Sequence, residues 1–215
     1  MLQIESVPDS LKSKMSSTPN LSHRVLLPSH VKPVSYDISL SPDLVNFTFD
    51  GICSIDIIVS SVTNTITMHA KDLDIQTVRI GDAQGVITYD EKLSRCVFTF
   101  EKELKLGPSI APLIINYKGN LNSDMAGFYR SKYKDHCGKE QYMASTQFEA
   151  LDARRAFPCW DEPAVKAVFI LTMIVPEDLT AVANMPETSC SLLQNNLKKI
   201  TFEKTPIMST YMVEF

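Results

Sequence analysis

Residues 147–149 are the part of this 215-residue chain whose types and spacing could do chemistry. They read Gln147-Phe148-Glu149. In an extended strand, Gln147 and Glu149 point to one face and Phe148 points to the other. A carboxylate and a carboxamide that converge in this way suit an ammonium group, which offers three donors and a positive charge. The first interpretation is therefore an amine-binding pair.

The charged segment that follows offers a second interpretation. Its side chains can pair with one another, and they are Asp152, Arg154, Arg155, Asp161 and Glu162. In this interpretation Glu149 is one more member of an ion network that ties a turn to the fold, and it braces Arg154 or Arg155. We assign the two arginines themselves to structure, because arginine forks paired with carboxylates hold turns together.

The elements that must position these residues are strands. Val34, Tyr36, Ile38 and Leu40 alternate with polar residues, a pattern typical of a half-buried strand. Comparable segments separated by turn residues are 47–58, 65–70, 75–80, 86–89, 96–100, 113–117, 142–148, 168–175, 180–183, 199–203 and 211–215. Only 151–157 looks helical, and the polar stretch 118–139 is predicted to be a long loop. The expected fold is all-β, a mostly antiparallel β-sandwich with minimal helix.

Composition narrows the class of protein. Residues 1–22 are serine-rich and lack apolar periodicity, so we expect a flexible tail followed by one domain over 23–215. The net charge is −4, which argues against nucleic acid as a partner. No apolar run approaches the roughly 20 residues that span a bilayer, so no membrane partner is expected. The start resembles no signal peptide, and the five cysteines are widely spaced. Both observations favour a cytoplasmic protein with reduced thiols.

Several catalytic motifs are absent from the sequence. There is no H-E-x-x-H, no G-x-S-x-G and no glycine-rich phosphate loop. His69 lies in a predicted strand and is interpreted as a packing residue. We therefore expect neither a catalytic residue nor a metal ligand in this chain.

Three blocks of sequence carry a resemblance to a known family. They are Gly127-Phe128-Tyr129-Arg130, Thr146-Gln147-Phe148-Glu149-Ala150, and the run from Asp152 to Pro163, which reads DARRAFPCWDEP. They resemble the zinc aminopeptidases of the aminopeptidase N type, and most closely the cytosolic puromycin-sensitive branch. The similarity extends over about residues 26–213.

The resemblance implies a division of labour between two domains. In that family a first β-sandwich domain rests on a thermolysin-like catalytic domain, which supplies G-A-M-E-N, H-E-x-x-H and the zinc ion. None of these motifs occurs here, so the chain is expected to be the N-terminal domain alone, with zinc only in the parent enzyme. By the resemblance, Glu149 grips the α-amino group of the substrate, Gln147 lines the same pocket, and the Glu149–Ala150 peptide bond is cis. The expected partners are peptide N-termini and the catalytic domain.

Two functions remain open at this point. One is the amine-recognition domain of a zinc aminopeptidase, which Glu149 and Gln147 favour. The other is a non-catalytic β-sandwich module for protein interaction derived from that family, which the missing zinc motif favours. In the first case a face that meets the catalytic domain is expected to expose an apolar patch near Phe128, Tyr129, Phe157 and Trp160, and to promote self-association.

Overall fold

The structure is a computed structural model and describes residues 26–215. The predicted tail at residues 1–22 lies outside the described residues, so that prediction stays untested. Within the described range, strands account for nearly all regular structure, together with three short 3-10 turns.

The elements follow one another with short connections. In chain order they are β1 (Val31–Asp43), β2 (Thr48–Val59), β3 (Thr65–His69), β4 (Leu73–Ile80), β5 (Ala83–Asp90), η2 (Glu91–Leu93), β6 (Arg95–Phe100), β7 (Gly107–Pro108), β8 (Leu113–Asn120), β9 (Gly127–Lys134), β10 (Glu140–Gln147), η3 (Ala153–Arg155), β11 (Lys166–Pro176), β12 (Glu187–Leu192), β13 (Leu197–Phe202), β14 (Met208–Ser209) and η4 (Thr210–Met212).

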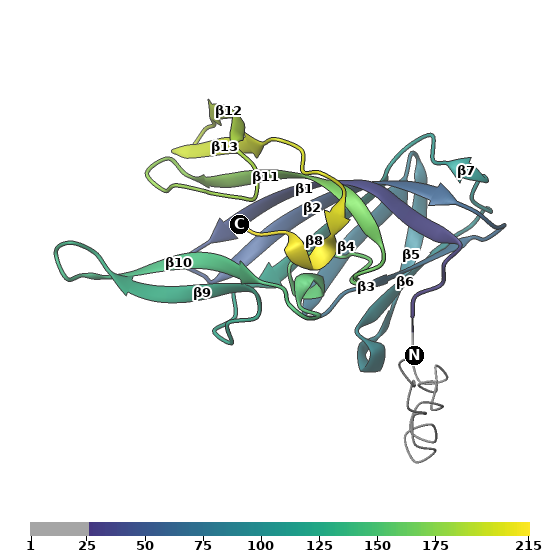
Figure 1. Ribbon diagram of the computed structural model, residues 1–215, viewed down its shortest axis with the longest axis horizontal. Coiled ribbons are helices and arrows are strands. Elements are labelled where there is room, and N and C mark those ends of the chain that lie inside the picture. Colours follow the sequence, from purple (N-terminus) through teal and green to yellow (C-terminus); the bar gives the residue numbers. More distant parts are fainter. Residues whose placement is uncertain (1–25) are drawn as a thin grey trace, which may run out of the picture.

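Twelve of the strands form one continuous sheet, which Figure 1 shows as a strongly curved surface. Its order is β12-β13-β11-β1-β2-β8-β4-β5-β6-β3, with β14 beside β11 and β7 beside β2. The ladder between β1 and β11 is parallel, and the other ladders are antiparallel. The mostly antiparallel all-β fold expected from the period-two pattern is confirmed.

The sheet turns a corner between β4 and β5 and so makes a second layer. Only the pairs Arg79–Gln84 and Ile80–Ala83 join these two strands. Beyond these pairs β5 separates from β4, and its residues 85–90 pair with the whole of β6. Strand β6 then pairs with β3, which completes the second layer. The side chains between the layers are fully buried, among them Val78, Phe98 and Ile115. Burial of this apolar surface is the main stabilising term of the fold.

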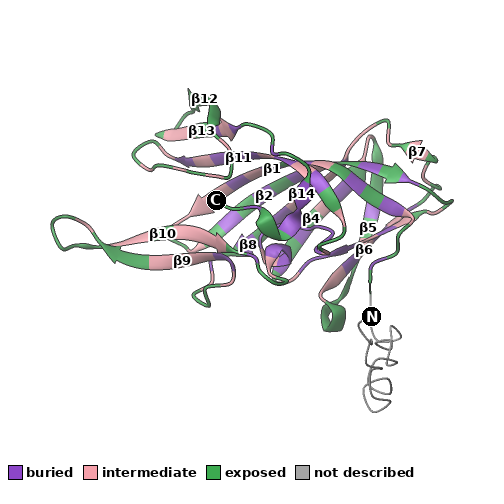
Figure 2. Ribbon diagram, in the orientation of Figure 1, coloured by how far each residue is buried: buried purple, intermediate pink, exposed green. Residues whose placement is uncertain are grey.

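Strands β9 and β10 form a separate two-stranded sheet that projects from the main sheet (Figure 1). Figure 2 shows this hairpin as partly buried at its base and exposed toward its tip. An isolated hairpin is marginally stable in water, so its base depends on contacts with the main body. Phe47 provides one such contact, since its ring lies 4.7 Å from that of Tyr142 and 4.4 Å below the guanidinium of Arg130.

Four sequence predictions are wrong. The expected loop at 118–139 contains the end of β8 and all of β9. The expected strands at 180–183 and 211–215 are irregular chain and the η4 turn. The expected apolar patch is not exposed: Tyr129 is half-buried, and Phe128, Phe157 and Trp160 are at most 1% accessible. These aromatic side chains fill the domain's own core, which removes the reason to expect self-association through them.

Candidate functional site

Gln147 and Glu149 lie where the hairpin ends and the chain returns to the main body. Gln147 is the last residue of β10 and pairs with Gly127, the first residue of β9. Gln147 and Glu149 are exposed, whereas Phe148 between them is only 2% accessible. The alternation predicted from the sequence is therefore present, with the polar pair on the solvent side.

A tight turn over residues 148–152 carries Glu149. The backbone N–H of Asp152 donates a hydrogen bond of 2.9 Å to the carbonyl of Phe148, which closes the turn. Within it the Glu149–Ala150 peptide bond is cis, as the family resemblance implied. Residues 149–151 are exposed, so Glu149 faces solvent. The residues at the two ends of the turn, Phe148 and Asp152, are both held by contacts with the rest of the domain.

Phe148 fixes the first end through aromatic contacts. Its ring meets Phe157 at 5.9 Å and Phe215 at 6.0 Å, both edge to face. This geometry suits aromatic quadrupoles and adds to the gain from burial. The hydroxyl of Thr146 also binds the backbone of Phe215, accepting from its N–H at 3.0 Å and donating to its carbonyl at 3.2 Å. The C-terminal segment of the chain is thus held against β10.

Arg155 fixes the second end. Its guanidinium lies 3.0 Å from a carboxylate oxygen of Asp152 and 3.4 Å from one of Asp72, which precedes β4 in the main sheet. The side chain of Arg155 is 18% exposed, and that of Asp72 is 62% exposed. This pairing is therefore a partly solvated network at the rim of the domain.

Arg154, the preceding residue, points into the domain. Its Nε donates to a carboxylate oxygen of Asp161 at 2.8 Å, and a second guanidinium nitrogen reaches the Asp161 carbonyl at 3.3 Å. The Asp161 N–H in turn donates to Nδ1 of His69 at 3.2 Å. His69 also exchanges backbone hydrogen bonds with Cys159, which joins β3 to the segment after η3. The structural assignment of Arg154 and the packing role predicted for His69 are both confirmed.

Burial sets the charge states in this interior network. Burial, together with the nearby positive charges of Arg154 and Arg95, lowers the pKa of His69 to about 3, so the imidazole is neutral. Burial also raises the pKa of Asp161, against which the hydrogen bonds and charge of Arg154 act. The network is thus a buried ion pair capped by a neutral histidine.

Glu149 takes no part in either network. Among residues 26–215 no hydrogen bond or ion pair engages its side chain, and both arginines are paired with aspartates instead. Glu162 likewise stays outside the predicted pairing and accepts from the Leu27 N–H at 2.6 Å. The interpretation in which Glu149 braces Arg154 or Arg155 is therefore wrong for this structure.

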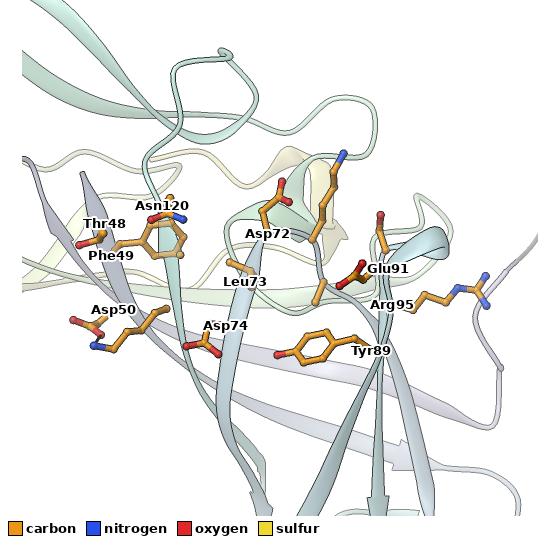
Figure 3. Close-up of a pocket in the computed structure, with 15 residues that line it drawn as sticks. Thr48, Phe49, Asp50, Asp72, Leu73, Asp74, Tyr89, Glu91, Arg95 and Asn120 are labelled. Carbon is orange, nitrogen blue, oxygen red and sulfur yellow. Dashed lines mark ion pairs between the residues drawn. The ribbon is translucent and has the colours of Figure 1, made fainter. Parts of the chain in front are cut away.

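A cavity of about 950 Å³ lies on the same side of the domain, beside the turn that holds Asp72. Figure 3 shows the residues that line it, with Asp72, Leu73 and Asp74 on one side and Tyr89, Glu91 and Arg95 on the other. Neither Gln147 nor Glu149 lines this cavity. Asp50 and Asp72 on its wall are already paired, with Lys118 and Arg155 respectively. The cavity is therefore separate from the predicted amine site, although Lys71 and Asp72 on its wall also belong to the segment that supports that site.

Sequence reasoning missed Asp72. This residue lies far along the chain from the turn it supports, and no motif marks it. The Lys71 N–H donates to the Arg154 carbonyl at 2.9 Å, and this contact between the β3–β4 turn and η3 brings Asp72 to Arg155. Only the fold makes that connection, so no local pattern could have found it.

A zinc site does not fit the residues that the structure describes. Within 26–215, no group of three or more His, Cys, Asp or Glu side chains is arranged to hold a metal ion. In the same range, no helix has the length and apolar character needed to cross a bilayer. Fold and site together define a β domain that displays the carboxylate of Glu149 on an anchored turn, with no metal centre among its described residues.

Comparison with known proteins gives the family. Residues 32–212 match the Peptidase M1 N-terminal domain, and the chain belongs to this family. It is 42% identical over 206 residues to Aminopeptidase 2 of Candida albicans, a match that covers 95% of this chain and 22% of that protein. It is 41% identical over 196 residues to the puromycin-sensitive aminopeptidase of Caenorhabditis elegans, covering 88% of this chain and 20% of that protein. The chain thus spans about a fifth of the length of these relatives.

Proposed function

We propose that this chain is the substrate-amine-recognition domain of a zinc aminopeptidase. In this proposal Glu149 binds the α-ammonium group of a peptide, Gln147 lines the same pocket, and a catalytic domain outside these residues supplies the zinc ion. The parent protein would release N-terminal residues from peptides in the cytoplasm.

The observation that carries the proposal is the state of Glu149. A carboxylate without an ion-pair partner among residues 26–215 is displayed on a turn whose ends are both held, by Phe148 and by Asp152. Such a group is ready to accept charge-assisted hydrogen bonds from an ammonium group. The names of the relatives, which include aminopeptidases from yeast and nematode, support the same substrate class.

In this proposal a catalytic domain outside these residues would carry out the hydrolysis. A zinc ion held by that domain would supply Lewis-acid chemistry and an activated water. The described residues offer no ligand set for it. The contribution of this domain is therefore binding and orientation: an ammonium held at Glu149 fixes the distance between the peptide's first residue and the reacting centre.

The test compares this chain with the longer polypeptide proposed to carry it. The longer polypeptide should hydrolyse aminoacyl-anilides that have a free amine and leave their N-acetylated counterparts intact, because acetylation removes the ammonium charge. This chain alone should hydrolyse neither substrate. Equal cleavage of acetylated and free substrates would contradict amine recognition. A longer polypeptide with no hydrolytic activity would favour the interaction-module alternative.

A further inference from the structure

The turn that carries Glu149 is held at one end by an apolar contact and at the other by an ionic one. Phe148 packs among Phe157 and Phe215 in the core, whereas Asp152 is held by Arg155 at 3.0 Å. Three exposed residues lie between these anchors. The direction of the Glu149 carboxylate therefore depends on both anchors, and the ionic anchor is the one that can be removed without opening the core.

Arg155 also joins the turn to two other parts of the molecule. Its second partner, Asp72, is 3.4 Å away and lies directly before β4 of the main sheet. The Cβ of Arg155 lies 2.6 Å from the position that a Cβ atom on residue 127 would occupy, so Gly127 and Arg155 are in close contact. Gly127 pairs with Gln147 across the hairpin. One side chain thus fixes the main sheet, the base of the hairpin and the Glu149 turn relative to one another.

These contacts contribute little to global stability. Asp72 is 62% exposed, and solvent screens an ion pair at such a site, so the pair stabilises the fold only weakly. Loss of the Arg155 contacts should therefore affect substrate recognition more than stability, because misplacing a binding group by about 1 Å can reduce the rate up to a hundredfold.

We propose that Arg155 is a positioning residue, which holds the 148–152 turn so that Glu149 and Gln147 face the substrate ammonium together. The inference rests on the proposed function of Glu149. It assigns to Arg155 a role in recognition in addition to the structural one, and it separates Arg155 from its neighbour Arg154, whose partner Asp161 lies in the interior.

The experiment is a double-mutant cycle on the longer polypeptide, with KM and kcat measured on an aminoacyl-anilide. Arg155→Met should raise KM about three- to tenfold. Its kcat should change less than twofold. In the Glu149→Ala background, Arg155→Met should cause no further increase in KM, because Arg155 acts through the carboxylate that is already gone. Arg155→Lys, which keeps the charge but loses the fork, should give an intermediate KM.

Arg130→Met provides the matched control. Arg130 is also a half-buried arginine, and its guanidinium is bound to the Leu121 carbonyl and the Phe47 ring at the base of the same hairpin. Its loss should leave KM unchanged. Multiplicative KM effects of Glu149→Ala and Arg155→Met, or an equal KM increase in Arg130→Met, would overturn the positioning role alone. A wild-type polypeptide without activity, or unchanged KM in Glu149→Ala, would overturn the proposed function and this inference with it.

Discussion

Arg154 and Arg155 are neighbours in sequence and opposite in environment. The side chain of Arg154 is 11% exposed and binds Asp161, which is 3% exposed, whereas Arg155 binds Asp72, which is 62% exposed. The η3 turn sends one guanidinium into the interior and the other to the rim. The same pairing chemistry therefore serves the core in one case and the presentation of Glu149 in the other.

The difference lies in what happens when the pair is broken. A carboxylate that loses its partner in the interior stays desolvated, and this penalty exceeds what the pair contributed. A carboxylate that loses its partner at the rim is hydrated by water at little cost. Disruption of the interior network should therefore show in the free energy of unfolding, and disruption of the rim network should show in binding.

The largest effect is expected for Arg154→Met. This change leaves Asp161 buried without its ion pair, and it should lower the free energy of unfolding by about 3–5 kcal/mol. Urea unfolding at neutral pH measures this value, and Arg155→Met is the matched comparison, with an expected loss of about 0–1 kcal/mol.

A companion variant covers the case in which Arg154→Met does not fold. Arg154→Met combined with Asp161→Leu removes both charges and should recover much of the lost stability, because no buried charge is left unpaired. Equal stability losses in Arg154→Met and Arg155→Met would remove the distinction between interior and rim.

An intermediate effect on the free energy of unfolding is expected for Gly127→Ala, because the added methyl group would contact Arg155 from the hairpin. Gly127 has φ of +71°, and an added Cβ would lie 2.6 Å from the Cβ of Arg155. Left-handed backbone and close contact together should cost about 2–3 kcal/mol. Thermal unfolding measures the loss.

Gly138→Ala is the control for Gly127→Ala. Gly138 lies at the hairpin tip with φ of +77° and no heavy atom within 4 Å of an added Cβ. It should therefore show only the backbone cost of about 1–2 kcal/mol. If both glycine variants lose the same stability, the contact between Gly127 and Arg155 is unimportant.

The smallest effect on stability at neutral pH is expected for His69→Asn, which keeps an acceptor near the Asp161 N–H. Its effect should appear on acidification. The pKa of His69 is about 3 in the folded chain against an ordinary 6.5, so the unfolded state binds more protons between these values. Stability of the wild type should therefore fall as pH drops from about 6.5 to about 3. The raised pKa of Asp161 acts with the opposite sign.

The comparison of unfolding midpoints between pH 7 and pH 4 isolates the histidine. Wild type and His69→Asn share the other titrating groups, so the variant should lose less stability than the wild type over this range. An identical pH dependence of the two proteins would mean that His69 is not held neutral by the interior network.

The sequence predicted the parts of this molecule that depend on local pattern. Alternation of apolar and polar residues located most of the strands, and the same alternation placed Gln147 and Glu149 on the solvent side of Phe148. The hairpin strand β9 was missed because Arg130, Ser131 and Lys132 are consecutive polar residues, which interrupt the alternation of apolar and polar residues. This strand pairs with β10 alone. Its stability comes from tertiary contacts that local periodicity does not record.

The supports of the candidate site were less predictable than the site itself. The charges of 152–162 were expected to pair, and two of the pairs are present, but the partner Asp72 comes from another strand connection. The aromatic residues expected at an exposed interface turned out to fill the core. Large apolar side chains are buried either in the core of their own domain or in an interface with another domain. The sequence alone does not distinguish these two locations.

The kinetics and stability of Glu149→Ala in the longer polypeptide test the central claim most directly. Loss of a charge-assisted ammonium contact of roughly 1.5–3 kcal/mol should raise KM about ten- to a hundredfold. The melting temperature should change little, since the Glu149 side chain has no partner among residues 26–215 to lose. A lowered melting temperature with an unchanged KM would contradict the account and return Glu149 to a purely structural role.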